Sequence, residues 1–150
     1  MKRALPALAV VLMLVGGCAD EPRQTTTDSS RIPGPNDTLV VYDKSGGVAG
    51  IHQRLAVRPD GAARIETNDG VARVKLKPDE LDAVRRTEDA AFGPQLEPVY
   101  GSGPAPADGF VTTLIGDTRR VRVTEGARPP RELQELISLC AALIGRYGPR

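Results

Sequence analysis

The chain has 150 residues, a net charge of +1, no Trp and 3% aromatic residues. The near-neutral charge predicts no nucleic-acid binding, because that function needs a concentrated basic face. The scarcity of aromatic side chains also leaves few surfaces on which bases or sugars could stack.

The first 18 residues have the order of an export signal that ends in a cysteine. Lys2 and Arg3 precede an apolar run from Ala4 to Val15, which is shorter than the roughly 20 residues that span a bilayer as a helix. Gly16 and Gly17 then stand directly before Cys18, an arrangement that resembles the lipobox of bacterial lipoproteins. The resemblance implies a signal peptide over residues 1–17, diacylation of Cys18, and a lipid anchor on the extracytoplasmic face of the cell membrane. The alternative is an ordinary secretory signal.

The mature chain divides into a tether and one domain. Residues 18–37 consist of the lipidated cysteine followed by a polar, Pro-containing stretch. This stretch has few apolar side chains that could be buried, so we predict that it is a disordered tether. Residues 38–147 are enough for one domain with one core. Because the anchor uses Cys18, Cys140 has no intramolecular partner, and a disulfide framework is not expected.

The first part of this domain is expected to be rich in strands. Leu39–Tyr42 predicts a strand, and the glycine-rich stretch 43–50 predicts a loop in which glycine permits positive φ. Alternating apolar and polar residues on both sides of Pro59-Asp60-Gly61 predict a hairpin over residues 51–67. A further strand over residues 72–77 follows the turn at Asn68-Asp69-Gly70.

The rest of the domain predicts two helices separated by a hairpin. The first helix begins at Pro78 and ends at Gly93, with the carboxylates of Asp79, Glu80, Glu88 and Asp89 facing water. A surface loop over residues 95–108 then leads to strands over 110–115 and 119–124. The last helix follows Pro129-Pro130, carries an apolar stripe that includes Cys140, and is ended by Gly145 and Gly148.

This order of elements predicts an α+β fold. Short turns between neighbouring strands favour an antiparallel β-sheet of about five to six strands, with two helices packed on one face. Cys140 is expected to be a buried thiol without reactivity.

Groups that could carry chemistry are scarce. His52 is the only histidine and has no second ligand at metal-binding spacing, so no metal is predicted. Ser45 with His52 as base lacks the surroundings of a nucleophile elbow. The glycines at 46, 47 and 50 lead into a strand and follow Lys44, unlike a phosphate-binding loop. The sequence therefore predicts no enzyme activity, cofactor or small-molecule substrate. Arginines 119, 120 and 122 are expected on a solvated strand face, with lipid headgroups or an acidic protein surface as the alternatives.

Several segments resemble the emfourin family. They are Leu39–Tyr42 followed by Ser45–Ile51, the stretch Leu76–Leu81, Ala90–Phe92, Asp108–Thr112 and Pro129–Leu133. Together they lie within residues 38–144, and the Ser-Gly-Gly-Val-Ala-Gly turn is the sharpest of them. Emfourins are protein inhibitors of protealysin, a thermolysin-like zinc metallopeptidase. The lipoprotein leader and tether are a departure from the pattern.

The resemblance implies a non-catalytic binding domain whose partner is a thermolysin-like metallopeptidase. A rigid scaffold with a projecting loop is all that such an inhibitor requires. The candidate binding loop contains Ser45, Gly46, Gly47, Val48 and Gly50. The alternative is a structural lipoprotein that interacts with the cell envelope and has no peptidase target.

Overall fold

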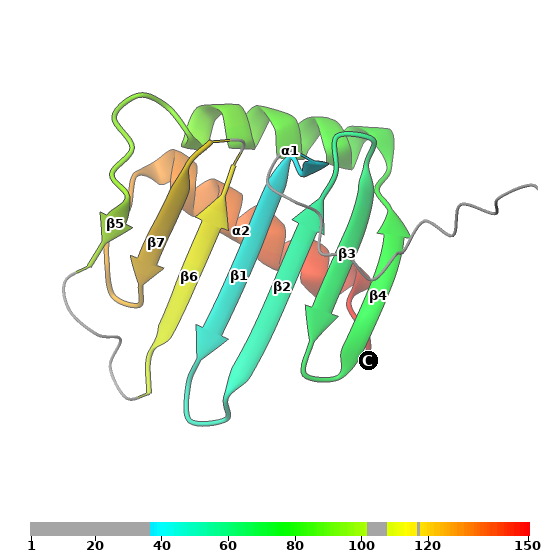
Figure 1. Ribbon diagram of the computed structural model, residues 1–150, viewed down its shortest axis with the longest axis horizontal. Coiled ribbons are helices and arrows are strands. Elements are labelled where there is room, and N and C mark those ends of the chain that lie inside the picture. The colour runs from blue at the N-terminus through cyan, green and yellow to red at the C-terminus, as the bar shows by residue number, and fades with distance from the viewer. Residues whose placement is uncertain (1–36, 102–107, 117) are drawn as a thin grey trace, which may run out of the picture. The chain divides into compact units, whose positions relative to one another are not determined.

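The computed structural model describes residues 37–101, 108–116 and 118–150. The predicted signal peptide, Cys18 and nearly all of the tether lie outside the described residues. The described part is an α+β fold, a seven-stranded sheet with two helices on one of its faces (Figure 1), as predicted for its class. The strands are β1 (Val40–Gly46), β2 (Ile51–Val57), β3 (Ala62–Thr67), β4 (Gly70–Lys75), β5 (Val99–Tyr100), β6 (Phe110–Ile115) and β7 (Arg120–Thr124). The helices are α1 (Pro78–Ala91) and α2 (Arg131–Tyr147).

The sheet follows the order β4-β3-β2-β1-β6-β7-β5. Six neighbouring strands pair antiparallel, and β5 alone runs parallel to its neighbour, β7. The hairpin expected over residues 51–67 is confirmed, with Leu55 opposite Ile65 and a turn in which Gly61 takes a φ of +82°. The hairpin of β6 and β7 is confirmed as well.

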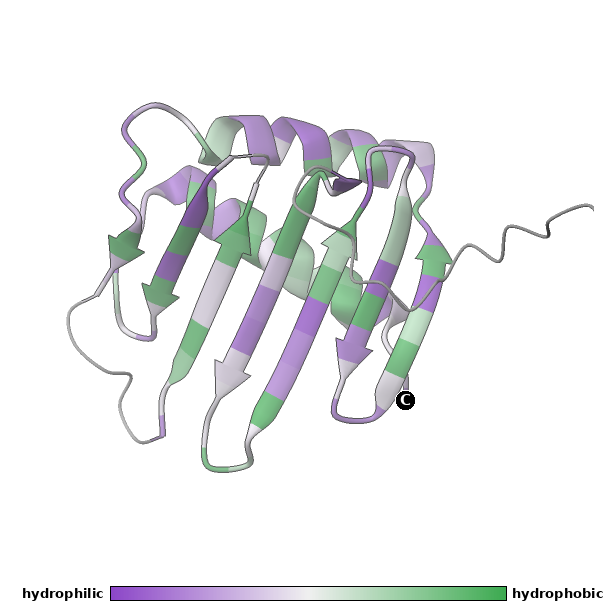
Figure 2. Ribbon diagram, viewed as in Figure 1, coloured by the Kyte–Doolittle hydropathy of each residue, from purple (hydrophilic) through white to green (hydrophobic). Residues whose placement is uncertain are grey.

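The core lies between the sheet and the two helices. Hydrophobic and hydrophilic residues alternate along β3, β4 and β7 (Figure 2). Most of the buried strand residues point toward the helices, and Val41, Ala56 and Thr124 are buried on the other face. Each buried aliphatic side chain contributes about 1.5–3 kcal/mol relative to an exposed one. The apolar stripe of α2 supplies Leu133, Leu136, Cys140 and Leu143, and the strands supply Val40, Tyr42, Leu55, Val57, Ile65, Leu114 and Val121. The expectation that Cys140 is buried is confirmed.

Two features of the sheet differ from the sequence-based expectation. β1 continues to Gly46 instead of ending at Tyr42, because residues 43–46 hydrogen-bond to β2 on one side and to β6 on the other. β5 lies in the stretch predicted to be a loop, and together these pairings bring the sheet to seven strands instead of five or six. Arg122 N donates to Pro98 O at 2.9 Å beside this short strand.

Two predictions about the helices were wrong. Glu88 was placed in water but is buried, and its carboxylate lies against the backbone of Gly116, where a Cβ atom would stand 2.7 Å from Oε1. Gly145 was expected to end α2, which instead continues through it to Tyr147. In the part of the chain that the structure covers, no helix has the length and apolarity needed to cross a bilayer.

Glu80 links the beginning of α1 to the end of α2. Its Oε2 accepts a hydrogen bond from the backbone N–H of Lys77 at 3.0 Å and one from the Tyr147 hydroxyl at 2.9 Å. Its Oε1 pairs with the Arg146 guanidinium, and the Glu80 side chain is only 13% exposed. The Lys77 N–H first, and then the Tyr147 hydroxyl and Arg146, hold the pKa of the Glu80 carboxyl below its usual range. Glu80, whose carboxylate was expected to face water, therefore joins the two helices.

We expect Glu80→Gln to lower the free energy of unfolding at pH 7 by about 1–2 kcal/mol, through loss of hydrogen bonds to a charged acceptor. Because the folded-state pKa is depressed, this stabilisation exists above the unfolded pKa of roughly 4.3 and is lost as the pH falls through the folded value. Urea unfolding between pH 7 and pH 3 should therefore show a smaller loss of stability in the variant than in the wild type. Asp79→Asn, a matched change in the same helical turn, should leave the wild-type pH profile in place.

Candidate functional site

The β1–β2 hairpin brings together three of the five predicted binding residues at its tip. Gly47, Val48 and Gly50 form the turn, whereas Ser45 and Gly46 belong to β1. Ser45 is paired with His52 in register and lies on the sheet face that carries no helix. The predicted loop is therefore shorter than expected, and Ser45 is separated from the tip.

Glycine is required where the tip leaves the sheet. Gly46 has a φ of +127°, and a Cβ atom there would overlap the carbonyl oxygen of Gly109. A Cβ atom on Gly47 would stand 2.8 Å from the Phe110 ring. Gly47 N donates to Gly109 O at 3.1 Å, and Gly50 N donates to Gly47 O at 3.0 Å. These contacts fix the base of the turn against β6, and the close approach of the two backbones leaves no room for a side chain at Gly46 or Gly47.

Val48 stands at the end of this fixed turn. Its side chain is 86% exposed, the highest value among the exposed large hydrophobic residues of the described chain. Asn68, from the neighbouring β3–β4 turn, donates to Gly50 O at 3.1 Å and accepts a hydrogen bond from His52 N at 2.7 Å. The tip therefore presents an apolar side chain on backbone that is tied to strands on both sides.

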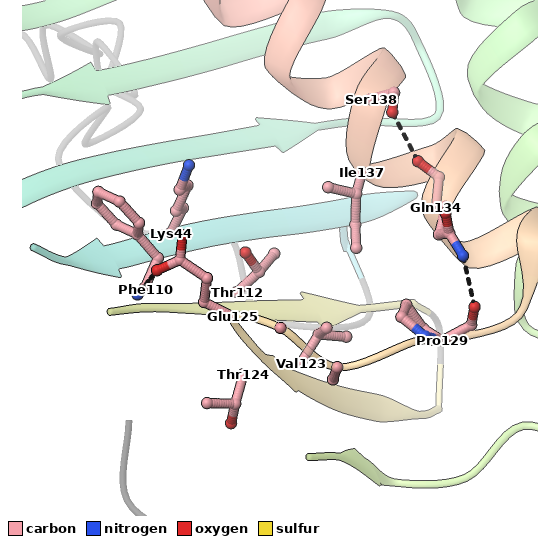
Figure 3. Close-up of a pocket in the computed structure, with 12 residues that line it drawn as sticks. Lys44, Phe110, Thr112, Val123, Thr124, Glu125, Pro129, Gln134, Ile137 and Ser138 are labelled. Carbon is pink, nitrogen blue, oxygen red and sulfur yellow. Dashed lines mark hydrogen bonds between the residues drawn. The ribbon is translucent and has the colours of Figure 1, made fainter. Parts of the chain in front are cut away.

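A groove of about 320 Å³ opens beside the base of the tip, between the sheet and α2. The Nζ atom of Lys44 lies 4.3 Å from the centre of the Phe110 ring, a cation–π contact. Glu125 Oε2 accepts a hydrogen bond from Phe110 N at 2.9 Å, and Ile137 of α2 points into the same space (Figure 3). An apolar floor with one cation and one carboxylate suits a peptide segment or an apolar side chain.

A second groove of about 460 Å³ lies at the other side of the tip. It is lined by Ile51, by the β3–β4 turn and by the end of α2. The sequence predicted neither groove, because each is formed by segments far apart along the chain. The alternation of β6 placed Phe110 in a strand, but gave no sign that its ring would lie beneath Gly47.

The side chains of Asp43, Ser45 and His52 share the sheet face without helices. His52 Nε2 lies 3.5 Å from Asp43 Oδ2, and Arg54 Nη1 lies 3.7 Å from the same oxygen. His52 is 46% exposed, no hydrogen bond joins it to Ser45, and Ser45 lines none of the cavities described above. Across residues 37–101, 108–116 and 118–150, no group of three or more His, Cys, Asp or Glu residues is arranged to hold a metal ion.

Two of the segments that resemble emfourins lie at the tip. Ser45–Ile51 forms the turn with its flanking strand residues, and Asp108–Thr112 leads into β6 beneath it. The relationship itself stays a prediction. Comparison of the chain with models of known protein families and with curated proteins finds no match for it.

Proposed function

We propose that this chain is an extracytoplasmic lipoprotein, anchored to the cell membrane through Cys18, whose domain is a non-catalytic binding module. Its specific function in this proposal is to inhibit a thermolysin-like metallopeptidase. The leader sequence supports the anchor, and the emfourin-like segments support the class of target. The observation that carries the binding role is Val48, an apolar side chain 86% exposed on a fixed hairpin tip.

The proposed mechanism is occlusion of the peptidase cleft by the β1–β2 tip. Clefts that bind peptides are lined mainly by apolar side chains, which an exposed valine can fill. The hydrogen bonds of Gly47 and Gly50 hold the turn in one conformation, so little conformational entropy is lost when the cleft closes around it. The groove beside Lys44 and Phe110 would then contact the rim of the cleft.

We expect Val48→Asp to weaken inhibition by thirtyfold or more. Burying a valine side chain contributes about 2 kcal/mol, which corresponds to about thirtyfold in affinity, and a carboxylate adds a cost of desolvation. The inhibition constant of the domain from Thr38 onward would be measured against a thermolysin-like enzyme. Val71→Asp is the matched control, because Val71 is 50% exposed on β4, the far edge strand of the sheet.

Equal inhibition constants for the two variants would show that Val48 does not contact the peptidase. No inhibition by the wild-type domain at high molar excess would remove the peptidase target and favour the alternative, an envelope-interaction lipoprotein. The anchor has its own test, in which Cys18→Ser should move the protein from the membrane fraction to the soluble fraction. Mass spectrometry should find diacylated Cys18 at the amino terminus of the wild type, and an unmodified cysteine there would contradict the proposal.

A further inference from the structure

The sheet face without helices carries a concentration of positive charge. In Figure 1, α2 crosses behind the sheet and α1 runs along the upper ends of the strands, so the alternate strand residues that point away from α2 form one broad face. We call it the open face. Its charged strand residues, placed by the pairing register, are the basic Arg54, Arg64, Arg73, Lys75, Arg120 and Arg122 and the acidic Asp43 and Glu66.

The excess of positive over negative charge lies on one side of the domain. Six basic against two acidic side chains give the strands of the open face a net charge of +4. Residues 37–150 contain 16 basic and 16 acidic residues, so the remainder of this part of the chain carries −4. A near-neutral sequence thus folds into a strongly asymmetric body, because the arginines alternate with core residues along β2, β3, β4 and β7. Such a face attracts an anionic surface over a distance of about one Debye length.

The basic residues lie in two groups near opposite edges of the sheet instead of converging on one point. Arg73 and Arg64 face each other on β4 and β3, while Arg120 and Arg122 lie on β7, close to the opposite edge of the sheet. Glu66 and Asp43 neutralise part of the charge in the middle, through contacts with Arg64 and Arg54, and Asp60 of the β2–β3 turn pairs with Lys75. A flat array of separated cations fits a layer of anionic headgroups better than it fits one phosphate or one carboxylate in a pocket.

Two exposed apolar side chains lie at the margins of the same face. The register places Val71, Glu66, Arg54, Asp43, Thr113, Arg122 and Val99 in one row across all seven strands. Val71 and Val99, at the two ends of this row on the edge strands, are 50% and 48% exposed. Basic residues flanked by apolar ones are the combination with which peripheral proteins contact a bilayer interface.

From this geometry we infer that the open face docks on an anionic phospholipid surface. The inference rests on the proposed anchor for its proximity, because residues 19–37 can extend over at most about 65 Å from a lipidated Cys18. Docking would direct the helix side of the domain, and the groove beside Lys44, away from the bilayer. The lipid on Cys18 would then retain the protein, while the open face would set its orientation.

The test uses the whole mature chain, residues 18–150, with Cys18→Ser so that no lipid contributes. Sedimentation with vesicles of phosphatidylglycerol and phosphatidylcholine in equal parts should show binding at 50 mM salt, at least tenfold stronger than to phosphatidylcholine alone. Binding should fall at least tenfold at 300 mM salt, because the attraction is screened. Each basic residue at an anionic surface contributes about fivefold to partitioning.

The combined change Arg73→Gln, Arg120→Gln and Arg122→Gln should therefore weaken vesicle binding by about a hundredfold. Arg86→Gln, Arg128→Gln and Arg131→Gln remove the same charge from exposed positions outside the sheet, and should change binding less than threefold. Circular dichroism and thermal melting of both variants verify that they are folded. A single tryptophan introduced by Val71→Trp, in a chain that has none, should shift its fluorescence to shorter wavelength on the anionic vesicles. Ser138→Trp on α2 should not shift.

Absence of binding to anionic vesicles would overturn the inference, and so would equally strong binding to neutral vesicles. An equal loss of vesicle binding in the two triple variants would overturn it as well. Stronger retention on immobilised polyglutamate than on vesicles of equal charge would indicate an acidic protein partner, and would overturn it too. Because position 18 is serine throughout, these results do not depend on lipidation or on peptidase inhibition. An unmodified Cys18 in the native protein would contradict the proposed anchor while leaving this measurement unchanged.

Discussion

Replacing Gly46 with alanine is expected to lower the free energy of unfolding by about 3 kcal/mol. Gly46 adopts a φ of +127°, which a residue with a Cβ atom adopts only under strain, and that atom would overlap Gly109 O. Separation of β1 from β6 at this point relieves the overlap, but it weakens the pairing of Gly46 with Phe110. Urea unfolding monitored by circular dichroism would measure the loss.

Two other glycines provide matched controls. Gly50 has a φ of +59° but nothing within 4 Å of its Cβ position, so Gly50→Ala should cost only about 1 kcal/mol. Gly145 lies inside α2 with open space around it, and Gly145→Ala should stabilise the protein by up to about 1 kcal/mol. Equal effects at positions 46 and 50 would show that β6 yields without cost, and would contradict the rigid tip on which the proposed function depends.

The alternation of residue types predicted the two hairpins whose strands alternate regularly, β2–β3 and β6–β7. In the β2–β3 hairpin, Leu55 and Ile65 are buried on one face while Arg54 and Arg64 lie on the other. Pro59-Asp60-Gly61 fixed the position of the turn. The alternation and the turn residues lie within one short stretch of the chain, so the sequence alone was sufficient to predict this hairpin.

The sequence was insufficient where a distant segment supplies the hydrogen bonds. Asp43 to Gly46 resemble a turn in composition, yet Lys44 and Ser45 are held in β1 by Thr112 and Val111 of β6, more than sixty residues further along the chain. Glu88 has the polarity of a surface residue, but the β6–β7 turn covers it. In both places tertiary pairing overrides local preference.

The same distinction applies to the candidate site. The glycines of the β1–β2 tip and the exposure of Val48 follow from a turn signal that can be recognised in the sequence. The groove requires Phe110 of β6 and Ile137 of α2 to meet beside Lys44, and no local pattern specifies that meeting. The basic open face could be predicted in part. The alternation along single strands predicted that their arginines point away from the core, but it did not predict that arginines of several strands share one face of the sheet.

Raising the pH from 7 to 11 is expected to remove about 4 kcal/mol of stability through two buried groups. Burial raises the pKa of the Cys140 thiol to about 12, from 9.0. Burial, with smaller contributions from Cys140 and Asp43, raises the pKa of Tyr42 to about 12, from 10.0. Both groups are neutral when protonated, and the folded protein retains these protons at pH values at which the unfolded chain has released them. Since the unfolded state then binds fewer protons, stability falls with rising pH, from about pH 9 for Cys140 and about pH 10 for Tyr42.

The double variant Tyr42→Phe and Cys140→Ala separates this effect from other alkaline titrations. It should be less stable than the wild type at pH 7, by about 1–3 kcal/mol, because it loses the Thr112 contact of the Tyr42 hydroxyl and leaves a small cavity. Since it cannot release these two protons on unfolding, its stability should fall by about 4 kcal/mol less than that of the wild type between pH 7 and pH 11, and the two curves should converge or cross. Tyr100→Phe, which removes a hydroxyl beside the short strand β5, should follow the wild-type curve. Parallel curves for the double variant and the wild type would mean that the thiol and the phenol ionise in the folded core as readily as in water, which is incompatible with side chains shielded from solvent by α2 and the sheet.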